Sequence, residues 1–417
     1  MLAVVVILAG VEGARGQQSG PLMGWGDNGQ GKEPAGYFRA VSTGNRHAIG
    51  IRADGTLHAW GEGAPHDLDE VPVELRGVQA IAVAAGYEHT IVLLADGTIA
   101  GWGEQVQPGA WPPGSTDPGA RPPNDPPGTT YVAIAAGEHI SVAIRSDGSL
   151  VSWGELYSYS CGDDIGCITC AGVPIPIGGF PFVSATPSGN DFVAISATGH
   201  YAIAQRADGT IVGWGVDSRC QVTNIPTGAV AAFSAGHQHG LSLAAGTYAF
   251  NGWGRNNFGQ RDNTLTLPAP GQPCLEGCVG FGCPSNCYKP PPVPFPALIR
   301  VGGSYFNSIG QRPDGWLIGW GRNSFGQSNV PAGSYFAFSC NYDHGFAIMF
   351  ADSDDSYANF DGGSGAAQRY SASDLIAFHQ SWAVGAARTD VNGDGAINGT
   401  DYLRFVDLFG RTIGGAP

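Results

Sequence analysis

Apolar and polar residues follow one another in short runs along this chain, and one arrangement of runs and turns recurs. Its clearest copy is the stretch 84–103, in which β-branched and aliphatic residues fill positions 90–94 and 98–102. Such residues favour strands. Asp96-Gly97 separates the two runs and can supply the positive φ angles of a type I′ hairpin turn. The pattern therefore predicts a two-stranded hairpin, which needs copies of itself to pack against.

Three features recur along the chain together with the hairpin. A Trp-Gly pair follows the second run, at Trp25, Trp60, Trp102, Trp153, Trp214, Trp253 and Trp320. An Asp-Gly turn separates the runs at Asp54, Asp96, Asp147, Asp208 and Asp314, with Ala245-Gly246 as a degenerate version. A small-residue segment precedes the first run, at Gly44, Gly86, Gly137, Gly199, Gly236, Gly303 and Asn341.

The two ends of the repeat are incomplete in complementary ways. Trp25 has no hairpin before it, whereas the last hairpin, at 346–352, has no Trp-Gly pair after it. The N-terminal strand is therefore predicted to complete the last unit and to close a ring of seven blades.

The order of these motifs resembles the regulator of chromosome condensation repeat in its compact bacterial form. The shared elements are Ala-Gly-x-x-His, Ala-Asp-Gly-Thr, Gly-Trp-Gly and Asn-x-x-Gly-Gln, and the last is clearest at 322–331. The resemblance covers about residues 20–352 and implies an all-β fold, a seven-bladed β-propeller. Members of that family serve as nucleotide-exchange factors, enzyme inhibitors and binding scaffolds, so the resemblance leaves the activity open.

The charge of the chain argues against one of these roles. Asp and Glu outnumber Lys and Arg by 35 to 20, which gives a formal net charge of −15. A nucleic-acid surface needs clustered basic residues. The composition therefore disfavours binding to chromatin or to other nucleic acids.

The first residues have the pattern of a secretory signal. Residues 2–11 are apolar but too short to span a bilayer, and Ala14-Arg15-Gly16 is a small-x-small cleavage site. The pattern lacks a basic start. We expect a signal peptide at 1–16, a propeller at 17–352, no membrane span, and a secreted or cell-surface location.

Large insertions all fall between a Trp-Gly pair and the next small-residue segment, at 105–130, 155–190 and 255–296. One type of connection in a closed ring is expected to emerge at one face. The insertions carry aromatic residues, among them Trp111, Tyr157, Tyr159, Phe180 and Tyr288. Two interpretations stay open: drift in tolerant loops, or a face that recognises a protein or a glycan.

A histidine occupies the same place in four of the repeats, at His47, His89, His239 and His344. A blade-by-blade repeat spreads such residues around a ring, whereas metal ligands must converge. We therefore expect a structural hydrogen bond from each of these histidines. The recurring tryptophan is expected to pack between blades.

Nine cysteines in an exported chain suggest disulfides. One insertion holds Cys161, Cys167 and Cys170, to which Cys220 would add a fourth, and another holds Cys274, Cys278, Cys283 and Cys287. The count leaves Cys340 as a free thiol. A zinc site in the second group is the alternative.

Beyond residue 352 the pattern changes to that of a calcium loop. Oxygen side chains fall at the first, third, fifth, ninth and twelfth places of 390–401, Gly395 permits the sharp turn, and one backbone carbonyl completes the set. The predicted Ca²⁺ ligands are Asp390, Asn392, Asp394, Ala396, Asn398 and Asp401. A degenerate second loop would use Asn359, Asp361, Ser364 and Asp374.

Two such loop–helix halves in 353–417 resemble a dockerin module. The resemblance implies a small α-helical domain of EF-hand type that folds with calcium and docks onto a cohesin-like partner or a cell-surface scaffold. Ser373 and Thr400 fall at the positions that dockerins use for recognition. In the first loop the closing carboxylate, Asp374, comes four residues late.

These features together favour an exported, non-catalytic binding or scaffold protein. The propeller loops would recognise a partner and the calcium module would attach the chain. The alternatives are a polysaccharide-degrading propeller enzyme with a dockerin, and a protein inhibitor. Against the enzyme, the sequence shows no paired carboxylates at a recurrent site and no Ser/His/Asp constellation.

Overall fold

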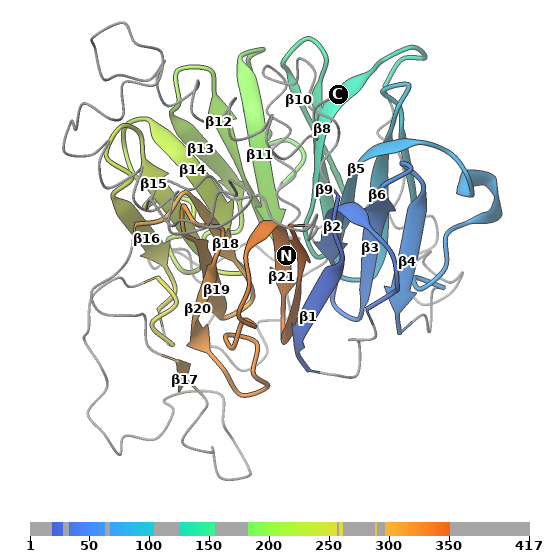
Figure 1. The fold of residues 1–417 in the computed structure, drawn as a ribbon. Helices are drawn as coiled ribbons and strands as arrows, with labels where there is room; N and C mark the ends of the chain where they lie inside the picture. Colours follow the sequence, from blue (N-terminus) through green and yellow to red (C-terminus); the bar gives the residue numbers. More distant parts are fainter. Residues whose placement is uncertain are drawn as a thin grey trace, which may run out of the picture.

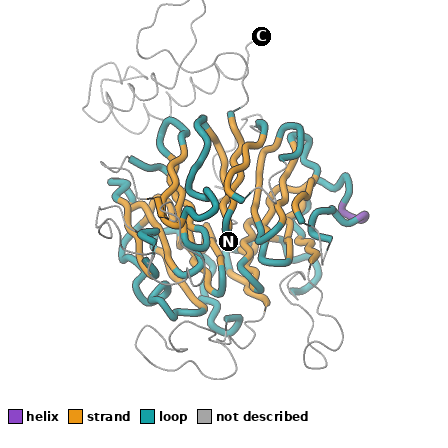
Figure 2. The backbone as a smooth tube through the Cα atoms, turned by 90° about the horizontal axis from the view of Figure 1, so that it is seen from below, coloured by secondary structure: helices purple, strands orange, loops and turns teal. Residues whose placement is uncertain are grey.

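The structure is a computed structural model, and it describes residues 19–27, 33–62, 67–103, 125–154, 182–256, 258–261, 288–289 and 297–350. These residues form seven antiparallel sheets, here called blades 1 to 7. Apart from strands and loops they contain one short 3-10 helix, η2 (Val73–Leu75), which is the purple segment of Figure 2. None of the described helices is long and apolar enough to cross a membrane.

Each blade has three strands in the same order. The first strands are β2 (Phe38–Thr43), β5 (Ala80–Ala85), β8 (Tyr131–Ala136), β11 (Phe192–Thr198), β14 (Val230–Ala235), β18 (Arg300–Gly303) and β21 (Tyr335–Asn341). The second strands are β3 (His47–Arg52), β6 (His89–Leu94), β9 (Ile140–Arg145), β12 (Tyr201–Arg206), β15 (His239–Ala244), β19 (Asn307–Gln311) and β22 (His344–Met349).

The third strands are β4 (Leu57–Gly61), β7 (Ile99–Gly103), β10 (Leu150–Gly154), β13 (Ile211–Gly215), β16 (Phe250–Gly254), β20 (Leu317–Arg322) and, for blade 7, β1 (Leu22–Gly26). In blade 6 a short fourth strand, β17 (Tyr288–Lys289), pairs with β20.

The ring closes as the two incomplete ends of the repeat predict. Strand β1 pairs antiparallel with β22, with Trp25 opposite Gly345 and Leu22 opposite Ile348. First strands of successive blades contact each other all the way round, and β2 of blade 1 also contacts β21 of blade 7. In Figure 1 the blue strand β1 lies at the orange strands of the last blade, where it pairs with β22. The N-terminal strand therefore completes the last blade, and the prediction is confirmed.

The Asp-Gly turns occur where predicted but differ in type. Gly55, Gly97 and Gly148 have φ values of 88°, 84° and 83°, whereas the preceding aspartates are not among the residues with positive φ. A type I′ turn would need positive φ at both positions. The loop is instead a type I turn followed by a left-handed glycine, with Gly97 N donating to Leu94 O at 3.0 Å. The predicted turn type was wrong because Asp-Gly fits both geometries.

The hydrophobic core lies between neighbouring blades. Ala82 and Ala84 of β5 pack with Ile91 of β6 against Ile134 of β8 and Trp153 of β10, which belong to the next blade. A blade alone would expose one side of this packing, so the ring is stable only as a whole.

Candidate functional site

The turns between first and second strands gather at one end of the ring. These inner turns comprise 44–46, 86–88, 137–139, 199–200, 236–238, 304–306 and 342–343. Backbone hydrogen bonds link neighbours among them: Tyr87 N to Glu138 O at 3.3 Å, Glu138 N to Gly199 O at 2.8 Å, and His237 N to Ser304 O at 2.9 Å. These bonds join the inner turns of blades 2 to 4 and those of blades 5 and 6, and the end of the ring that holds all seven turns is here called the inner-turn face.

The third strands end at this same face. Gly61 pairs with His47, and Glu62 N donates to Arg46 O at 2.8 Å. Two large insertions therefore leave the ring here, directly after β7 and β10, and the third begins after the loop that follows β16. The expectation that the insertions share one face holds for their first residues.

The insertions rejoin the ring at the opposite end, called the Asp-Gly face. There Tyr131 N donates to Gly97 O at 2.8 Å, and Phe192 N donates to Gly148 O at 3.1 Å. Each insertion therefore starts at the inner-turn face and ends at the Asp-Gly face. Sequence spacing alone did not show this, because it does not tell on which side of a blade the next first strand starts.

Six aromatic rings, one from each of blades 2 to 7, form a closed circle on the inner-turn face. Tyr305 stacks on His237 at 4.0 Å and on Tyr342 at 4.5 Å between ring centroids, and Tyr342 meets Tyr87 edge-on at 5.6 Å. The circle continues from Tyr87 to His139 at 6.0 Å, to His200 at 6.5 Å, and back to His237 at 6.2 Å. These six residues and Glu138 are called the inner-turn cluster.

Glu138 connects blades that are far apart in the ring. Its Oε2 lies 2.8 Å from His200 Nε2 and its Oε1 lies 3.0 Å from His237 Nε2. The Tyr342 hydroxyl, 204 residues away in the sequence, donates to the same Oε1 at 2.9 Å. The carboxylate thus ties blade 3 to blades 4, 5 and 7.

The environment fixes the charge of this carboxyl group. Burial alone would raise the pKa of Glu138, but the charges and hydrogen bonds of His200 and His237 outweigh it and hold the pKa well below the usual range. Burial lowers the pKa of His237, which Glu138 opposes in part, and burial together with the Glu138 charge raises the pKa of Tyr342. Glu138 is therefore an ionised acceptor whose two oxygens are both occupied.

This arrangement does not suit a metal. Both histidines point their Nε2 atoms at the carboxylate, so these atoms do not converge on a common ion. In the part of the chain that the structure describes, no group of three His, Cys, Asp or Glu residues is placed to hold a metal ion. The cluster joins blades and presents aromatic edges at the surface.

Three of the four recurring histidines act as predicted, by hydrogen bonding, and the bonds run between blades; for His344 the prediction was wrong. Nε2 of each lies close to a hydroxyl on the second strand of the next blade: His47 to Thr90 at 2.9 Å, His89 to Ser141 at 3.0 Å, and His239 to Ser308 at 3.1 Å. Burial lowers the pKa of each of these three histidines to about 3. They are neutral structural links between blades.

The fourth histidine shows what the pairing requires. His344 faces blade 1, where Ala48 stands at the position of the hydroxyl residue. Among the described residues neither ring nitrogen of His344 has a hydrogen-bond partner. Burial still lowers the pKa of His344 to about 4.

Tryptophans pack between blades as predicted, and three also make a hydrogen bond that the sequence did not reveal. Nε1 of Trp25 donates to Gln327 O at 2.9 Å, that of Trp253 to Gln221 O at 2.9 Å, and that of Trp320 to Gln260 O at 3.0 Å. Each glutamine lies in the loop that leads into the blade of its tryptophan. Two of them end the Asn-x-x-Gly-Gln motif, so this motif was the available signal.

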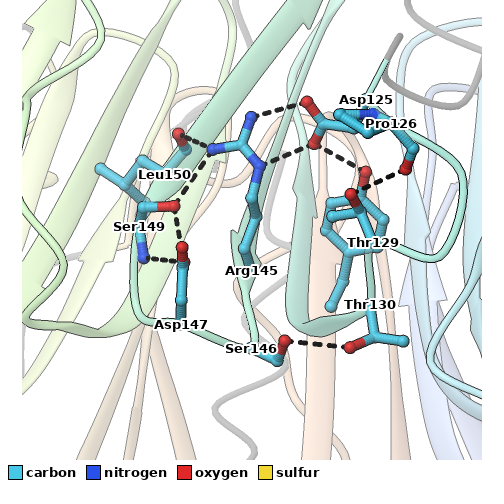
Figure 3. Close-up of polar contacts among 10 residues, drawn as sticks. Asp125, Pro126, Thr129, Thr130, Arg145, Ser146, Asp147, Ser149 and Leu150 are labelled. Carbon is cyan, nitrogen blue, oxygen red and sulfur yellow. Dashed lines mark hydrogen bonds and ion pairs between the residues drawn. The ribbon is translucent and has the colours of Figure 1, made fainter.

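A polar clasp on the Asp-Gly face holds the chain where the insertion 104–124 ends. Arg145 on β9 donates from Nε and Nη2 to the two oxygens of Asp125 at 2.7 Å and 2.8 Å, and from Nη1 to Leu150 O at 2.8 Å (Figure 3). Tyr131 also donates to Asp125 at 2.8 Å. The Arg145 guanidinium holds the pKa of Asp125 below its usual value. The clasp fixes the start of blade 3 whatever precedes it.

The cysteine prediction is confirmed at one position. Cys340 on β21 is free and buried, and burial raises the pKa of its thiol to about 12. Cys220 is disulfide-bonded, and its partner lies outside the described residues. The other cysteines also lie outside them.

Most residues predicted from sequence to bind a ligand or partner lie outside the described residues. These are the signal at 1–16, both calcium loops with Ser373 and Thr400, and the insertion residues Trp111, Tyr157, Tyr159 and Phe180. Tyr288 lies on β17, at the edge of blade 6. These predictions stay predictions. The inner-turn cluster was missed because its residues sit at the variable positions of Gly-x-x-His.

Comparisons with known proteins identify the repeat. The family described as regulator of chromosome condensation (RCC1) repeat matches residues 38–64 and 80–106, in blades 1 and 2. No curated protein matches the chain. The chain thus carries two segments that match this repeat, within a β-propeller of seven blades.

Solved structures of other proteins share the propeller fold. Prp20p from Saccharomyces cerevisiae, described with its binding to Gsp1p and histones, is 14% identical and has a TM-score of 0.54, covering 82% of this chain and 93% of that one. Yeast RCC1 (Prp20) bound by Kap60 is 16% identical with a TM-score of 0.54, covering 82% and 91%. Human WBSCR16 is 15% identical with a TM-score of 0.52, covering 80% and 99%.

Proposed function

We propose that this protein is a binding scaffold that recognises a protein partner through its inner-turn face. The observation that carries the proposal is that all seven inner turns lie at one end of the ring, where variable residues of blades 2 to 7 contact one another. Two large insertions leave the ring from the same face, so they can extend it. Variable residues on a rigid repeat scaffold are the usual basis of recognition by such proteins.

The chemistry of the inner-turn cluster supports recognition over catalysis. A general acid or base needs a proton that it can exchange with a substrate. Glu138 instead accepts hydrogen bonds from His200, His237 and Tyr342, and its side chain is only 12% exposed. What the cluster offers at its surface is aromatic: Tyr87 and Tyr305 are partly exposed. Aromatic residues are enriched at protein interfaces.

The solved propellers give this proposal a parallel. The yeast protein Prp20p is described with binding to Gsp1p and to histones, and with Kap60 bound to it. A propeller of this fold can therefore carry protein-binding surfaces. This chain, with a net charge of −15, is poorly suited to a nucleic-acid partner.

Export and calcium-dependent attachment complete the proposal and rest on the sequence alone. The apolar start with its small-x-small site supports secretion. The loop 390–401 supports Ca²⁺ binding, and the dockerin resemblance supports attachment of residues 353–417 to a cohesin-like or cell-surface partner. Aspartate at the twelfth place of the loop, Asp401, lowers the affinity for Ca²⁺ relative to glutamate. Outside the cell, where calcium is plentiful, such a loop would still bind Ca²⁺.

Deletions within the insertions test whether the inner-turn face binds the partner. Deletion of 105–124 leaves the Asp125 clasp intact, and deletion of 262–287 leaves Gln260 in place under Trp320. Binding to the partner isolated from the source organism should weaken in at least one deletion while the melting temperature is kept. Asp208→Asn on the Asp-Gly face is the matched control. If only the control variant lost binding, the proposal would be wrong.

The attachment module is tested by metal removal on the whole chain. Calcium should raise the melting temperature of a transition that chelator abolishes, and Asp390→Ala should remove this response because it deletes the first ligand of the loop. Asp361→Ala, in the degenerate loop, should remove it only in part. The same melting curve in calcium and in chelator would contradict a calcium module.

A further inference from the structure

The Asn-x-x-Gly-Gln motif builds rigid loops on the inner-turn face. In the loop 323–328, Asn323 Oδ1 accepts from Ser328 N at 2.9 Å, and Gln327 Oε1 accepts from Phe325 N at 2.9 Å. The two side chains replace the backbone bonds that a loop lacks. The backbone around Phe325 is thereby fixed before any partner arrives.

The same construction occurs in the two preceding connections. In 256–261, Asn256 Oδ1 accepts from Arg261 N at 3.2 Å, and Gln260 Oε1 accepts from Phe258 N at 2.8 Å. In 217–222, where Asp replaces Asn, Gln221 Oε1 accepts from Arg219 N at 2.7 Å. Three successive loops therefore present Arg219, Phe258 and Phe325 from equivalent positions.

Arginine and phenylalanine side chains interleave around the second and third loops. The Arg255 guanidinium lies 4.7 Å and that of Arg322 lies 5.7 Å from the ring centre of Phe306, and Arg322 lies 5.5 Å from that of Phe325. The rings of Phe258 and Phe306 are 5.3 Å apart. These five residues are called the Arg-Phe patch. Cation–π contacts of this kind hold guanidinium groups in place without neutralising them.

The patch combines an exposed apolar anchor with a partly exposed guanidinium group, Arg322, whose ion pair with Asp343 is long at 3.8 Å. Phe325 is 46% exposed, and the side chain of Arg322 is 27% exposed. The acidic neighbour of Arg322 is Asp343, whose Oδ1 lies 3.8 Å away and already accepts from Gln327 Nε2 at 2.9 Å. Arg255 is fixed underneath by Gln238 Oε1 at 2.6 Å. A carboxylate from outside can therefore still approach Arg322.

We propose that the Arg-Phe patch docks an acidic segment of the protein partner, with an aromatic or large apolar residue packed on Phe325. Charge complementarity supports this occupant, because guanidinium groups pair with carboxylates in a fixed, often bidentate geometry. The chain as a whole is acidic, so it repels a densely charged nucleic acid at long range. A short segment that buries an aromatic ring gains contact area that outweighs this repulsion. The inference rests on the proposed function and names the chemistry of its partner.

Synthetic peptides test the patch without knowledge of the partner. A fluorescent peptide of Glu and Asp around one Phe should bind the full chain, and should bind less well at high salt because exposed ion pairs are screened. The same peptide with Lys in place of the acids should bind at least about tenfold more weakly, as should the acidic peptide without its Phe.

Variants locate the binding. Arg322→Gln and Phe325→Ala should each weaken the acidic peptide about tenfold, with unchanged melting temperature because both side chains are partly or largely exposed. Arg206→Gln is the matched control, since Arg206 lies 4.5 Å over the ring of Phe192 on the Asp-Gly face. Equal binding of acidic and basic peptides, or equal loss in the Arg206 control, would overturn the inference.

The two proposals can fail separately. If the acidic peptide does not bind but the isolated partner still contacts the inner-turn face, only the chemistry assigned to the Arg-Phe patch is wrong. If the partner contacts the Asp-Gly face, the proposed function itself is wrong, and peptide binding at the patch would then be unrelated to that partner.

Discussion

The two faces of the propeller are built on opposite principles. On the Asp-Gly face each turn satisfies itself: Asp96 Oδ1 accepts from Thr98 N at 2.9 Å and from the Thr98 hydroxyl at 2.6 Å, and Asp208 and Thr210 repeat this geometry. On the inner-turn face Glu138 reaches residues of three other blades. At these two faces the repeated Asp-Gly turn thus makes its side-chain bonds within one blade, whereas the unrepeated Glu138 joins several blades.

Lowering the pH should have the largest effect on the free energy of unfolding, because the hydrogen bonds between blades depend on neutral histidines. The native pKa of His47, His89 and His239 is about 3, against 6.5 for a free histidine. Below pH 6.5 the unfolded chain binds protons that the native chain does not, so stability falls as the pH falls. Each histidine contributes up to about 1.4 kcal/mol per pH unit between 6.5 and about 4. Urea unfolding at several pH values measures this slope.

One variant separates the histidines from the carboxyl groups. His239→Asn should reduce the slope of the unfolding free energy against pH, between pH 6.5 and 5, by the contribution of one histidine, which is up to about 1.4 kcal/mol per pH unit. The reason is that an amide does not titrate. Asn307 already occupies this place in blade 6, so the ring accepts the residue. An unchanged slope in this variant would mean that His239 is not neutral in the native protein.

Glu138→Gln should be the most damaging single change on the inner-turn face. The amide keeps the shape but loses the charge that three donors share, which costs about 2 to 3 kcal/mol of unfolding free energy. Tyr342→Phe removes one of the three bonds and should cost about 1 kcal/mol. Asp147→Asn on the Asp-Gly face should change stability much less, because its bonds stay within one turn. Urea unfolding measures these losses of unfolding free energy. Similar losses for the variants on the two faces would contradict the proposed difference between them.

The hydrogen bond from tryptophan to the glutamine carbonyl should have a smaller effect on stability, which two matched variants can measure. Trp253→Phe loses the bond to Gln221 O, whereas Trp214→Phe loses none, since among the described residues Trp214 Nε1 has no partner. Both lose similar packing. Trp253→Phe should therefore cost about 1 kcal/mol more than Trp214→Phe. Equal losses would show that the bond contributes nothing to stability.

The thiol of Cys340 should give the smallest signal. It is buried and its pKa is raised to about 12, so almost none is thiolate at neutral pH. A thiol reagent should label Cys340 in urea and leave the native chain unlabelled at this residue. Peptide mapping reads the result, and rapid native labelling would show that blade 7 opens easily.

Sequence predicted the parts of the structure that repeat. The Trp-Gly pairs, the Asp-Gly turns and the missing halves at the two ends placed every hairpin and the closing strand β1. The inner-turn cluster could not be predicted, because Glu138 and Tyr342 stand at positions without a repeated residue and meet only once the ring is closed. The type of the Asp-Gly turn was missed because the dipeptide fits two geometries.

The central claim is that the inner-turn face is the binding surface, and one cross-linking measurement tests it. A photoreactive phenylalanine analogue replaces either Phe325 or Trp316, which are 46% and 42% exposed and lie at the inner-turn and Asp-Gly faces. Irradiation of the chain with its isolated partner should cross-link from position 325 and not from position 316. Cross-linking from position 316 alone would contradict the account.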